Sequence, residues 1–288
     1  MNWLVFHFAS GQAFFSGIAL VLLAVFAATR SATVFKRVTF LAFAIGAIAI
    51  ALSSTPIPYW YYTLATGMTI SWIVSWFIKS WRFWTSIGVV AIWIIAAIME
   101  LPFHFMPSVQ SIPTRTMTVI GDSVSAGLGG SEKSKTWPII FASQHDVAVQ
   151  DISHVGETVR TALKRAQSQT INSDLVIIEI GGNDLLGPTS AVDFATELDA
   201  LLTYLSKPNR QLVMFELPLP PFRQEYGRVQ RQVASKHGVR LVPKRIFLSV
   251  IAEGGSTIDS IHLSQAGHQK MADCVWSIAG GAFGKPAK

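Results

Sequence analysis

Three short polar segments in the second half of the chain hold residue types that can carry out nucleophilic chemistry on an acyl carbon. They are Gly121-Asp122-Ser123, Gly181-Gly182-Asn183-Asp184 and Asp259-Ser260-Ile261-His262. A serine hydroxyl becomes nucleophilic when an adjacent base takes its proton, and histidine is the side chain that titrates near neutral pH. On one tight turn, Asp259 can accept the Nδ1 proton of His262 and leave Nε2 free as that base. The chain therefore contains the parts of a Ser-His-Asp arrangement.

Each segment also has a simpler interpretation. Ser123 can be a helix N-cap, because serine is favoured at that position. Residues 181–184 can be a polar turn after a strand, and an Asp-x-x-His sequence is common by chance. In addition, Ser125 stands where the Gly-x-Ser-x-Gly elbow of α/β-hydrolases has its second glycine. None of the three segments is decisive alone.

The surrounding sequence predicts an α/β domain that brings the three segments together. From Arg115 onward, short β-branched runs alternate with helical patterns. Strands that are apolar throughout and separated by helices form a parallel sheet covered on both faces. Ligands bind beyond the carboxyl ends of such strands, so the site is expected in the loops after Ile120, Ile152 and Ile180. The predicted strands are residues 117–120, 147–152, 175–180, 212–216 and 239–242, and the predicted helices are 137–144, 157–169, 190–206, 224–236 and 264–278.

Four signals occur in a fixed order within this domain. Gly-Asp-Ser stands near its start, Gly156 follows the second predicted strand, Gly-x-Asn-Asp follows the third, and Asp-x-x-His precedes the last helix. Together with Trp137-Pro138 and residues 261–268, this order resembles the SGNH hydrolases, also called the GDSL family, and within it the small bacterial thioesterases, lysophospholipases and arylesterases. The resemblance covers residues 117–276. It implies a flavodoxin-like three-layer α/β sandwich with a parallel sheet, and a serine enzyme that hydrolyses ester bonds.

The resemblance also implies roles for individual residues. Ser123 is expected to be the nucleophile, His262 its general base and then general acid, and Asp259 the group that orients His262 and stabilises its charge. The backbone N–H groups of Ser123 and Gly156, with the side-chain amide of Asn183, are expected to form the oxyanion hole. Losing one such donor typically costs roughly 3 to 4 kcal/mol, or about 100- to 1000-fold in rate. No cofactor and no metal are expected, because the remaining histidines lack the spacing of metal ligands.

The chain departs from the family pattern at two positions. Val124 stands where leucine is usual, and Ser260 replaces a common glycine. Both are small changes beside the catalytic groups and are expected to leave activity intact. His268 is a rival to His262, but it follows Gly267 inside the final predicted helix, so a structural role is expected for it.

The first 110 residues lie outside the resemblance and are predicted to form a membrane domain. Their charged side chains are Arg30, Lys36, Arg37, Lys79, Arg82 and Glu100. A span needs about 20 apolar residues to cross about 30 Å of hydrocarbon, and Pro56 and Pro58 divide the longest apolar stretch. The sequence therefore predicts four transmembrane helices, at about 7–28, 38–54, 58–78 and 84–102. The predicted domains are a transmembrane domain at 1–105, a linker at 106–114 and the hydrolase domain at 115–288.

The basic residues predict an orientation. Arg30, Lys36 and Arg37 lie between the first two predicted helices, and Lys79 and Arg82 lie between the third and fourth. The positive-inside rule places both links in the cytoplasm. The hydrolase domain is then expected on the periplasmic or other extracytoplasmic side of a bacterial inner membrane. A cleaved signal peptide at residues 1–28 is the alternative, but no basic residue precedes its apolar run.

Three functions follow as candidates. The first is hydrolysis of an ester or thioester, on a small molecule, an acylated lipid or an O-acetylated envelope glycan. The second is acyl transfer at the outer membrane face, and the third is a non-catalytic scaffold. Four helices exceed the need of an anchor, so a membrane protein partner or a homo-oligomer is expected, with Gly46 and Ala49 permitting close approach. No nucleic-acid partner is expected, because most of the net charge of +6 lies beside apolar helices.

Overall fold

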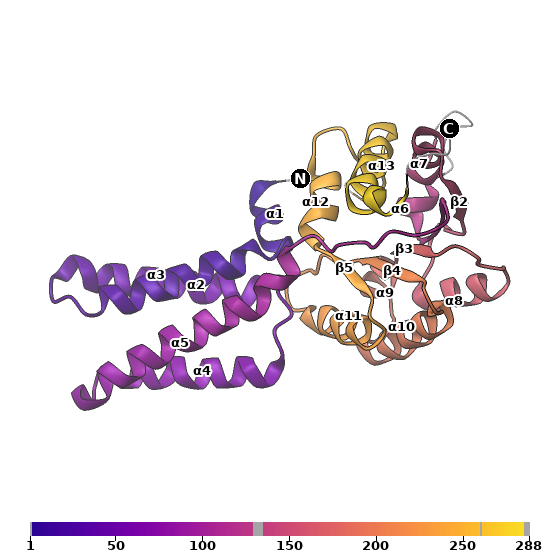
Figure 1. Ribbon diagram of the computed structural model, residues 1–288. Coiled ribbons are helices and arrows are strands. Elements are labelled where there is room, and N and C mark those ends of the chain that lie inside the picture. The colour runs from indigo at the N-terminus through magenta and orange to yellow at the C-terminus, as the bar shows by residue number, and fades with distance from the viewer. Residues whose placement is uncertain (1, 129–134, 260, 285–288) are drawn as a thin grey trace. The chain divides into compact units, whose positions relative to one another are not determined.

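The computed structural model describes residues 2–128, 135–259 and 261–284. The chain forms two compact units. The first unit comprises Met1–Phe6, Phe105–Pro218 and Glu225–Lys288, and the second comprises His7–His104 and Leu219–Gln224. The first unit contains the sheet and the second contains long apolar helices (Figure 1).

The first unit is built on a five-stranded parallel sheet with the strand order β2-β1-β3-β4-β5. This is the flavodoxin-like order, so the fold predicted for the hydrolase domain is confirmed. Strands β3 and β4 are buried at every residue, which explains why they are apolar except for Glu179 and Gln211 at their ends, whereas the edge strand β2 is partly exposed and more polar. The strands are β1 (Thr116–Gly121), β2 (Ala148–Asp151), β3 (Leu175–Glu179), β4 (Gln211–Phe215) and β5 (Arg240–Val242).

Helices cover both faces of this sheet and complete the three layers. Helices α8, α10 and α11 lie on one face, and α7, α12 and α13 lie on the other (Figure 1). The helices that the sequence predicts are present as α7 (Trp137–His145), α8 (Val159–Gln167), α10 (Ala191–Leu205), α11 (Gln224–Lys236) and α13 (Gln265–Ala279). Three further helices were not predicted, namely α6 (Ser123–Ala126), α9 (Gly182–Leu186) and α12 (Lys244–Ala252).

Capping residues explain where two of these helices begin. Helix α8 starts later than predicted because Thr158 and Thr161 form a capping box, in which each side chain bonds the backbone N–H of the other residue. Helix α13 begins after Ser264, whose Oγ accepts a hydrogen bond from the Gly267 N–H at 3.2 Å. This cap fixes the chain immediately after His262, so the position of that histidine depends on the start of α13.

The second unit contains apolar helices around a core that includes Phe14, Trp72 and Val89. Its helices are α2 (Gln12–Ala27), α3 (Thr33–Leu52), α4 (Tyr59–Val74) and α5 (Arg82–Glu100), and α1 (Trp3–Ala9) precedes them. Short 3-10 turns stand at η1 (Lys79–Trp81) and η2 (Leu101–His104), and a third, η3 (Gly280–Ala282), ends α13 in the first unit. Helices α2 and α3 approach closely at Gly17 and Gly46, where a Cβ on either glycine would lie 2.7 Å from the carbonyl oxygen of the other.

Two helices of the described chain are long and apolar enough to cross a membrane, Thr33–Leu52 and Arg82–His104. A third span results only if the pair Trp3–Ala9 and Gln12–Ala27, which is bent by 86°, counts as one. The bend falls at Gly11, whose φ of 84° is left-handed and ends α1. Helix α4 has 16 residues, or about 24 Å of length, which is short for a span. The four-span prediction is therefore supported only for two of its helices.

Candidate active site

The predicted nucleophile, Ser123, stands at the start of α6, directly after β1. The N-cap of this helix is Asp122, whose Oδ1 accepts a hydrogen bond from the Val124 N–H at 3.0 Å. The capping role considered for Ser123 therefore belongs to its neighbour. Gly121 permits the sharp turn, since a Cβ at this position would meet the Ser125 side chain. Ser123 is buried at the carboxyl end of β1.

The predicted base and its orienting carboxylate are joined by a short hydrogen bond. Nδ1 of His262 lies 2.6 Å from Oδ2 of Asp259. The other carboxylate oxygen of Asp259 accepts the backbone N–H groups of His262 at 2.9 Å and Ile261 at 3.2 Å. These bonds, the His262 N–H first, lower the pKa of Asp259 to about 2, so the carboxylate stays ionised near neutral pH. With Nδ1 as the donor to Asp259, Nε2 is left as the proton acceptor.

Asn183, the predicted oxyanion donor, connects the loops that follow β1 and β2. It lies in α9, directly after β3, and its Nδ2 donates to the Glu157 carbonyl at 2.9 Å and to Asp122 Oδ2 at 3.3 Å. These acceptors belong to the residues that adjoin Gly156 and Ser123 in the sequence. Gly156 adopts a left-handed φ of 75°, which favours glycine. The three loops expected to hold the oxyanion donors therefore meet at the carboxyl end of the sheet.

Asp122 links this cluster to His262 electrostatically. Burial raises the pKa of Asp122 to about 6, while the Val124 N–H and the nearby charge of His262 oppose that increase. A contact through Trp137 accompanies this interaction: Trp137 Nε1 donates to Ser125 Oγ in α6 at 3.1 Å, and the Trp137 backbone N–H donates to His268 Nδ1 in α13 at 3.3 Å. Helix α6, which begins at Ser123, and helix α13, which follows His262, therefore both contact the start of α7. The structure thus brings together segments from both ends of the hydrolase domain.

The sequence did not predict that two carboxyl groups, those of Glu179 and Asp184, are buried at this end of the sheet. Glu179, the last residue of β3, accepts a hydrogen bond from Ser125 Oγ at 3.0 Å, and Ser125 Oγ accepts one from Trp137 Nε1 at 3.1 Å. Burial first, and then the charge of Asp122, raise the pKa of Glu179 well above its ordinary value. Asp184 is also fully buried and its Oδ2 accepts the Val159 N–H at 2.9 Å. The sequence signal for Glu179 is a single charged residue inside an apolar strand.

The rival histidine, His268, has a structural position inside α13. It is buried, its Nδ1 accepts the Trp137 N–H at 3.3 Å, and burial lowers its pKa. Burial and the bond from the Trp137 N–H both favour the neutral ring, and that bond occupies Nδ1 of His268. Ser260, where the family pattern has glycine, lies outside the described residues. Within residues 2–128, 135–259 and 261–284, no group of three or more His, Cys, Asp or Glu side chains is arranged to hold a metal ion.

The doubly wound sheet, with a serine at a helix start after β1 and an Asp–His pair before the last helix, defines an SGNH-type hydrolase fold. Residues 119–270 match the GDSL-like lipase/acylhydrolase family, and the chain belongs to this family. It is an enzyme that hydrolyses ester bonds.

Characterised relatives and solved structures agree with this assignment. The chain is 26% identical to the esterase TesA of Pseudomonas aeruginosa over 181 residues, which are 58% of this chain and 89% of the relative. It is 27% identical to an arylesterase of Vibrio mimicus over 161 residues, which are 51% of this chain and 78% of the relative. A crystal structure of TesA superposes with a TM-score of 0.51 at 25% identity, covering 58% of this chain and 99% of that chain.

A solved esterase, EstA from Pseudoalteromonas sp., shares the fold at a TM-score of 0.52 and 20% identity, covering 58% of this chain and 97% of that chain. The family match begins at residue 119, so residues 1–118 lie outside it.

Proposed function

We propose that this protein is a membrane-anchored serine ester hydrolase that works through an acyl intermediate on Ser123. The observation that carries the proposal is the 2.6 Å bond between Asp259 Oδ2 and His262 Nδ1. This bond selects the tautomer in which Nε2 accepts a proton, and that is the tautomer a serine nucleophile requires. The catalytic residues are then Ser123, Asp259 and His262.

The proposed reaction has two halves. Ser123 Oγ attacks the ester carbonyl carbon while its proton passes to His262 Nε2, and the carbonyl oxygen takes up the negative charge. The N–H groups of Ser123 and Gly156 and the Asn183 amide stabilise that charge. Collapse of the intermediate breaks the bond to the leaving alcohol, which takes the proton from His262. Water then attacks the acyl-enzyme with the same base, and releases the acid and free Ser123.

The helical unit supports a membrane anchor in this proposal. Both qualifying spans present large apolar side chains outward, among them Phe40, Ile45, Ile94 and Ile98. We infer a multi-pass inner-membrane topology with a transmembrane domain at 1–105, a linker at 106–114 and the catalytic domain at 115–288 on the extracytoplasmic side. A substrate at the membrane surface fits this topology, either an acylated lipid or an O-acetylated envelope glycan.

Acyl transfer is a second candidate, because the helical unit contains a buried polar cluster at one end. Glu100 is fully buried and lies 3.6 Å from His104, while His7 Nε2 lies 2.8 Å from Ser16 Oγ. Ionisable groups inside a membrane protein are costly and commonly functional. Product analysis distinguishes the two activities: with an added alcohol acceptor, a hydrolase releases free acid, whereas a transferase forms a new ester.

The direct test compares His262→Gln with His268→Gln in the purified full chain, using hydrolysis of p-nitrophenyl butyrate in detergent. Removing the general base should lower kcat by roughly 1000-fold or more. Changing His268 should lower stability but keep kcat within a few-fold of wild type. A folded His262→Gln enzyme with wild-type kcat contradicts the proposed triad, and a folded wild-type chain that cleaves no ester substrate favours the scaffold.

A further inference from the structure

A pocket of about 500 Å³ lies at one end of the helical unit, and no predicted catalytic residue lines it. It is formed by the link between α2 and α3, the first turns of α3, the segment after α4 and the start of α5. All of its lining residues belong to the second unit. Its volume is within the range of about 300 to 1,000 Å³ that is usual for ligand pockets.

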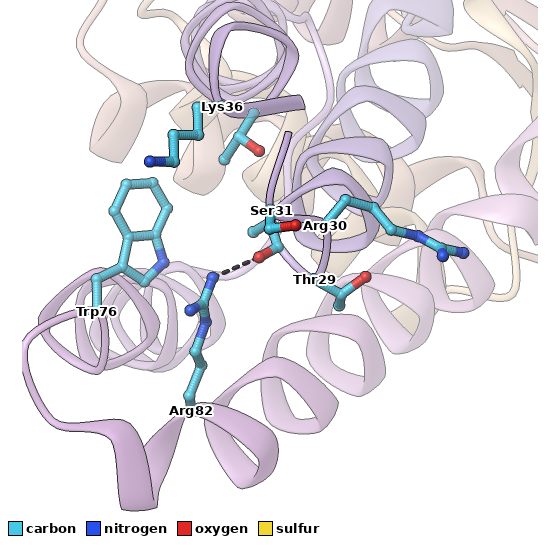
Figure 2. Close-up of a pocket in the computed structure, with 8 residues that line it drawn as sticks. Thr29, Arg30, Ser31, Lys36, Trp76 and Arg82 are labelled. Carbon is cyan, nitrogen blue, oxygen red and sulfur yellow. Dashed lines mark hydrogen bonds between the residues drawn. The ribbon is translucent and has the colours of Figure 1, made fainter. Parts of the chain in front are cut away.

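Two cationic side chains enter this pocket from different helices. Lys36 on α3 and Arg82 on α5 both line the pocket beside Trp76, whereas the Arg30 side chain points away from them (Figure 2). The Arg82 guanidinium donates to the Ala28 carbonyl, which holds it in place. The Arg30 guanidinium lies 5.3 Å from the centre of the Phe26 ring.

The positive charge in the pocket has no acidic counterpart nearby. Glu100 is the one acidic residue in the sequence of this unit, and it stands at the other end of α5, about 27 Å along the helix from Arg82. In the part of the chain that the structure describes, no ion pair involves Lys36 or Arg82. A bound anion would supply the missing charge.

The remaining lining favours a phosphate group in particular. The pocket includes Ser31, whose hydroxyl can donate, and lies at the start of the 20-residue helix α3, where the backbone carries a partial positive charge. The planar guanidinium of Arg82 matches two phosphate oxygens, while Lys36 adds a point charge. This combination of donors favours a phosphate with net negative charge over one whose charge is balanced by a cation of its own headgroup, as in phosphatidylcholine.

An apolar surface continues from the pocket along α3. Phe40, one turn beyond Lys36, is 68% exposed, and Trp76 at the pocket is 43% exposed. An acyl chain can lie on Phe40 while its headgroup occupies the pocket, and tryptophan is favoured at the level of lipid headgroups. Pockets lined by basic residues between membrane helices bind anionic lipid headgroups in this way.

We propose that the pocket containing Lys36, Arg82 and Ser31 is a binding site for the phosphate headgroup of an anionic phospholipid. The site goes beyond the hydrolase activity, since no predicted catalytic residue lines it. It lies on the side of the membrane that the basic links assign to the cytoplasm, so its occupant is a lipid of the inner leaflet. The bound lipid would fix α3 and α5 against each other at this end.

The test measures lipid binding to the full chain in detergent by native mass spectrometry, titrating phosphatidylglycerol against phosphatidylcholine. Wild type should bind phosphatidylglycerol at least tenfold more tightly. Lys36→Gln and Arg82→Gln should each weaken that binding about fivefold. The matched control is Arg37→Gln, which removes the same charge one residue away and outside the pocket lining, and should change binding less than twofold.

Three outcomes overturn the proposal. Equal binding of the two lipids removes the headgroup selectivity. If Arg37→Gln weakens lipid binding as much as Lys36→Gln, the lipid is attracted by the general positive charge of the surface and not by the pocket. Displacement of phosphatidylglycerol by millimolar inorganic phosphate identifies a free-phosphate site instead. Thermal unfolding and p-nitrophenyl ester hydrolysis are measured for each variant as controls. A variant that keeps its melting temperature and its esterase activity but loses lipid binding shows that the lipid site and the proposed catalytic site are independent.

Discussion

Among single residues, Asn183 donates both of its amide hydrogens within the protein, to Glu157 O at 2.9 Å and to Asp122 Oδ2 at 3.3 Å. The proposed donation to the oxyanion therefore requires that the substrate oxygen replaces one of these two acceptors. We predict that Asn183→Ala lowers kcat by about 100- to 1000-fold. It should also cost about 1 to 2 kcal/mol of stability from the lost hydrogen bonds. Steady-state kinetics and thermal unfolding measure the two effects separately.

The control for this prediction is Asn172→Ala. Asn172 is exposed in the loop before β3, so its replacement should leave both kcat and the melting temperature near wild type. If Asn183→Ala loses stability but keeps its kcat, the amide is a structural residue only, and the proposed oxyanion hole is wrong at that position.

The buried carboxyl group of Glu179 leads to a prediction about pH. Burial raises its pKa well above the ordinary value, so folding takes up a proton, and the corresponding stability is present at low pH and is lost as pH rises. Glu179→Gln keeps the shape and removes the titration. The melting temperature of the variant relative to wild type should therefore be higher at pH 8 than at pH 5. A difference that is constant with pH, or larger at pH 5, contradicts the raised pKa.

The residues that a motif specifies were accessible from sequence, and those that depend on tertiary contact were not. Ser123, Asn183, Asp259 and His262 stand in a recognisable order along the chain. In the structure Asp259 bonds His262, and Asn183 bonds the loops that hold Ser123 and Gly156. The chain of contacts from Trp137 through Ser125 to Glu179 spans three elements, so no local pattern could show it.

At the scale of elements, the strands were predictable because buried parallel strands are apolar at every position. The long helices of the hydrolase domain were predictable from the spacing of their apolar residues, which follows the helical period of 3.6. Helices α6 and α9 have four and five residues, which is too short for a period of 3.6 to be visible. The break at Gly11 was missed because glycine is frequent in transmembrane helices, so hydropathy alone gives no sign of a left-handed turn.

The contact between α2 and α3 gives a prediction at this scale. A Cβ at Gly46 would lie 2.7 Å from the Gly17 carbonyl, a backbone atom that cannot move aside easily. Gly46→Ala should therefore destabilise the helical unit by about 1 to 3 kcal/mol, as measured by thermal unfolding in detergent. Gly46 thus serves packing within the chain, whereas the sequence had suggested it for a partner.

Gly67→Ala is the matched control on α4. No atom lies within 4 Å of a Cβ at Gly67, and alanine is the better helix former, so this variant should be as stable as wild type or slightly more so. Equal melting temperatures for the two alanine variants would show that the close approach of α2 and α3 does not contribute to stability.

At the scale of the whole molecule, the proposed topology predicts where reporters are active. Alkaline phosphatase fused after Lys288 should be active, because it folds only outside the cytoplasm, and the same reporter inserted between Thr29 and Ala32 should be inactive. We expect this pattern because Arg30 and Arg82 lie in basic links between helices, and the positive-inside rule places such links in the cytoplasm. The reverse pattern would place the catalytic domain in the cytoplasm and the pocket with Lys36 and Arg82 on the outer side.

The composition of the whole chain predicted two parts, one rich in apolar residues and one with a balanced charge. Composition did not fix the number of spans. Helix α4 lies in an apolar stretch but has only 16 residues, and it is not among the helices long and apolar enough to cross a membrane. Nor does any periodicity in residues 1–110 show that Lys36 and Arg82, which are 46 positions apart, line one pocket.

The central claim, a serine nucleophile activated by His262, is tested most directly by covalent labelling with a fluorophosphonate probe in membranes. The account predicts that wild type is labelled, that Ser123→Ala is not, and that Ser153→Ala, which changes a serine of the neighbouring loop after β2, is labelled like wild type. Labelling that persists in Ser123→Ala, or a folded wild-type protein that takes up no probe, would contradict it.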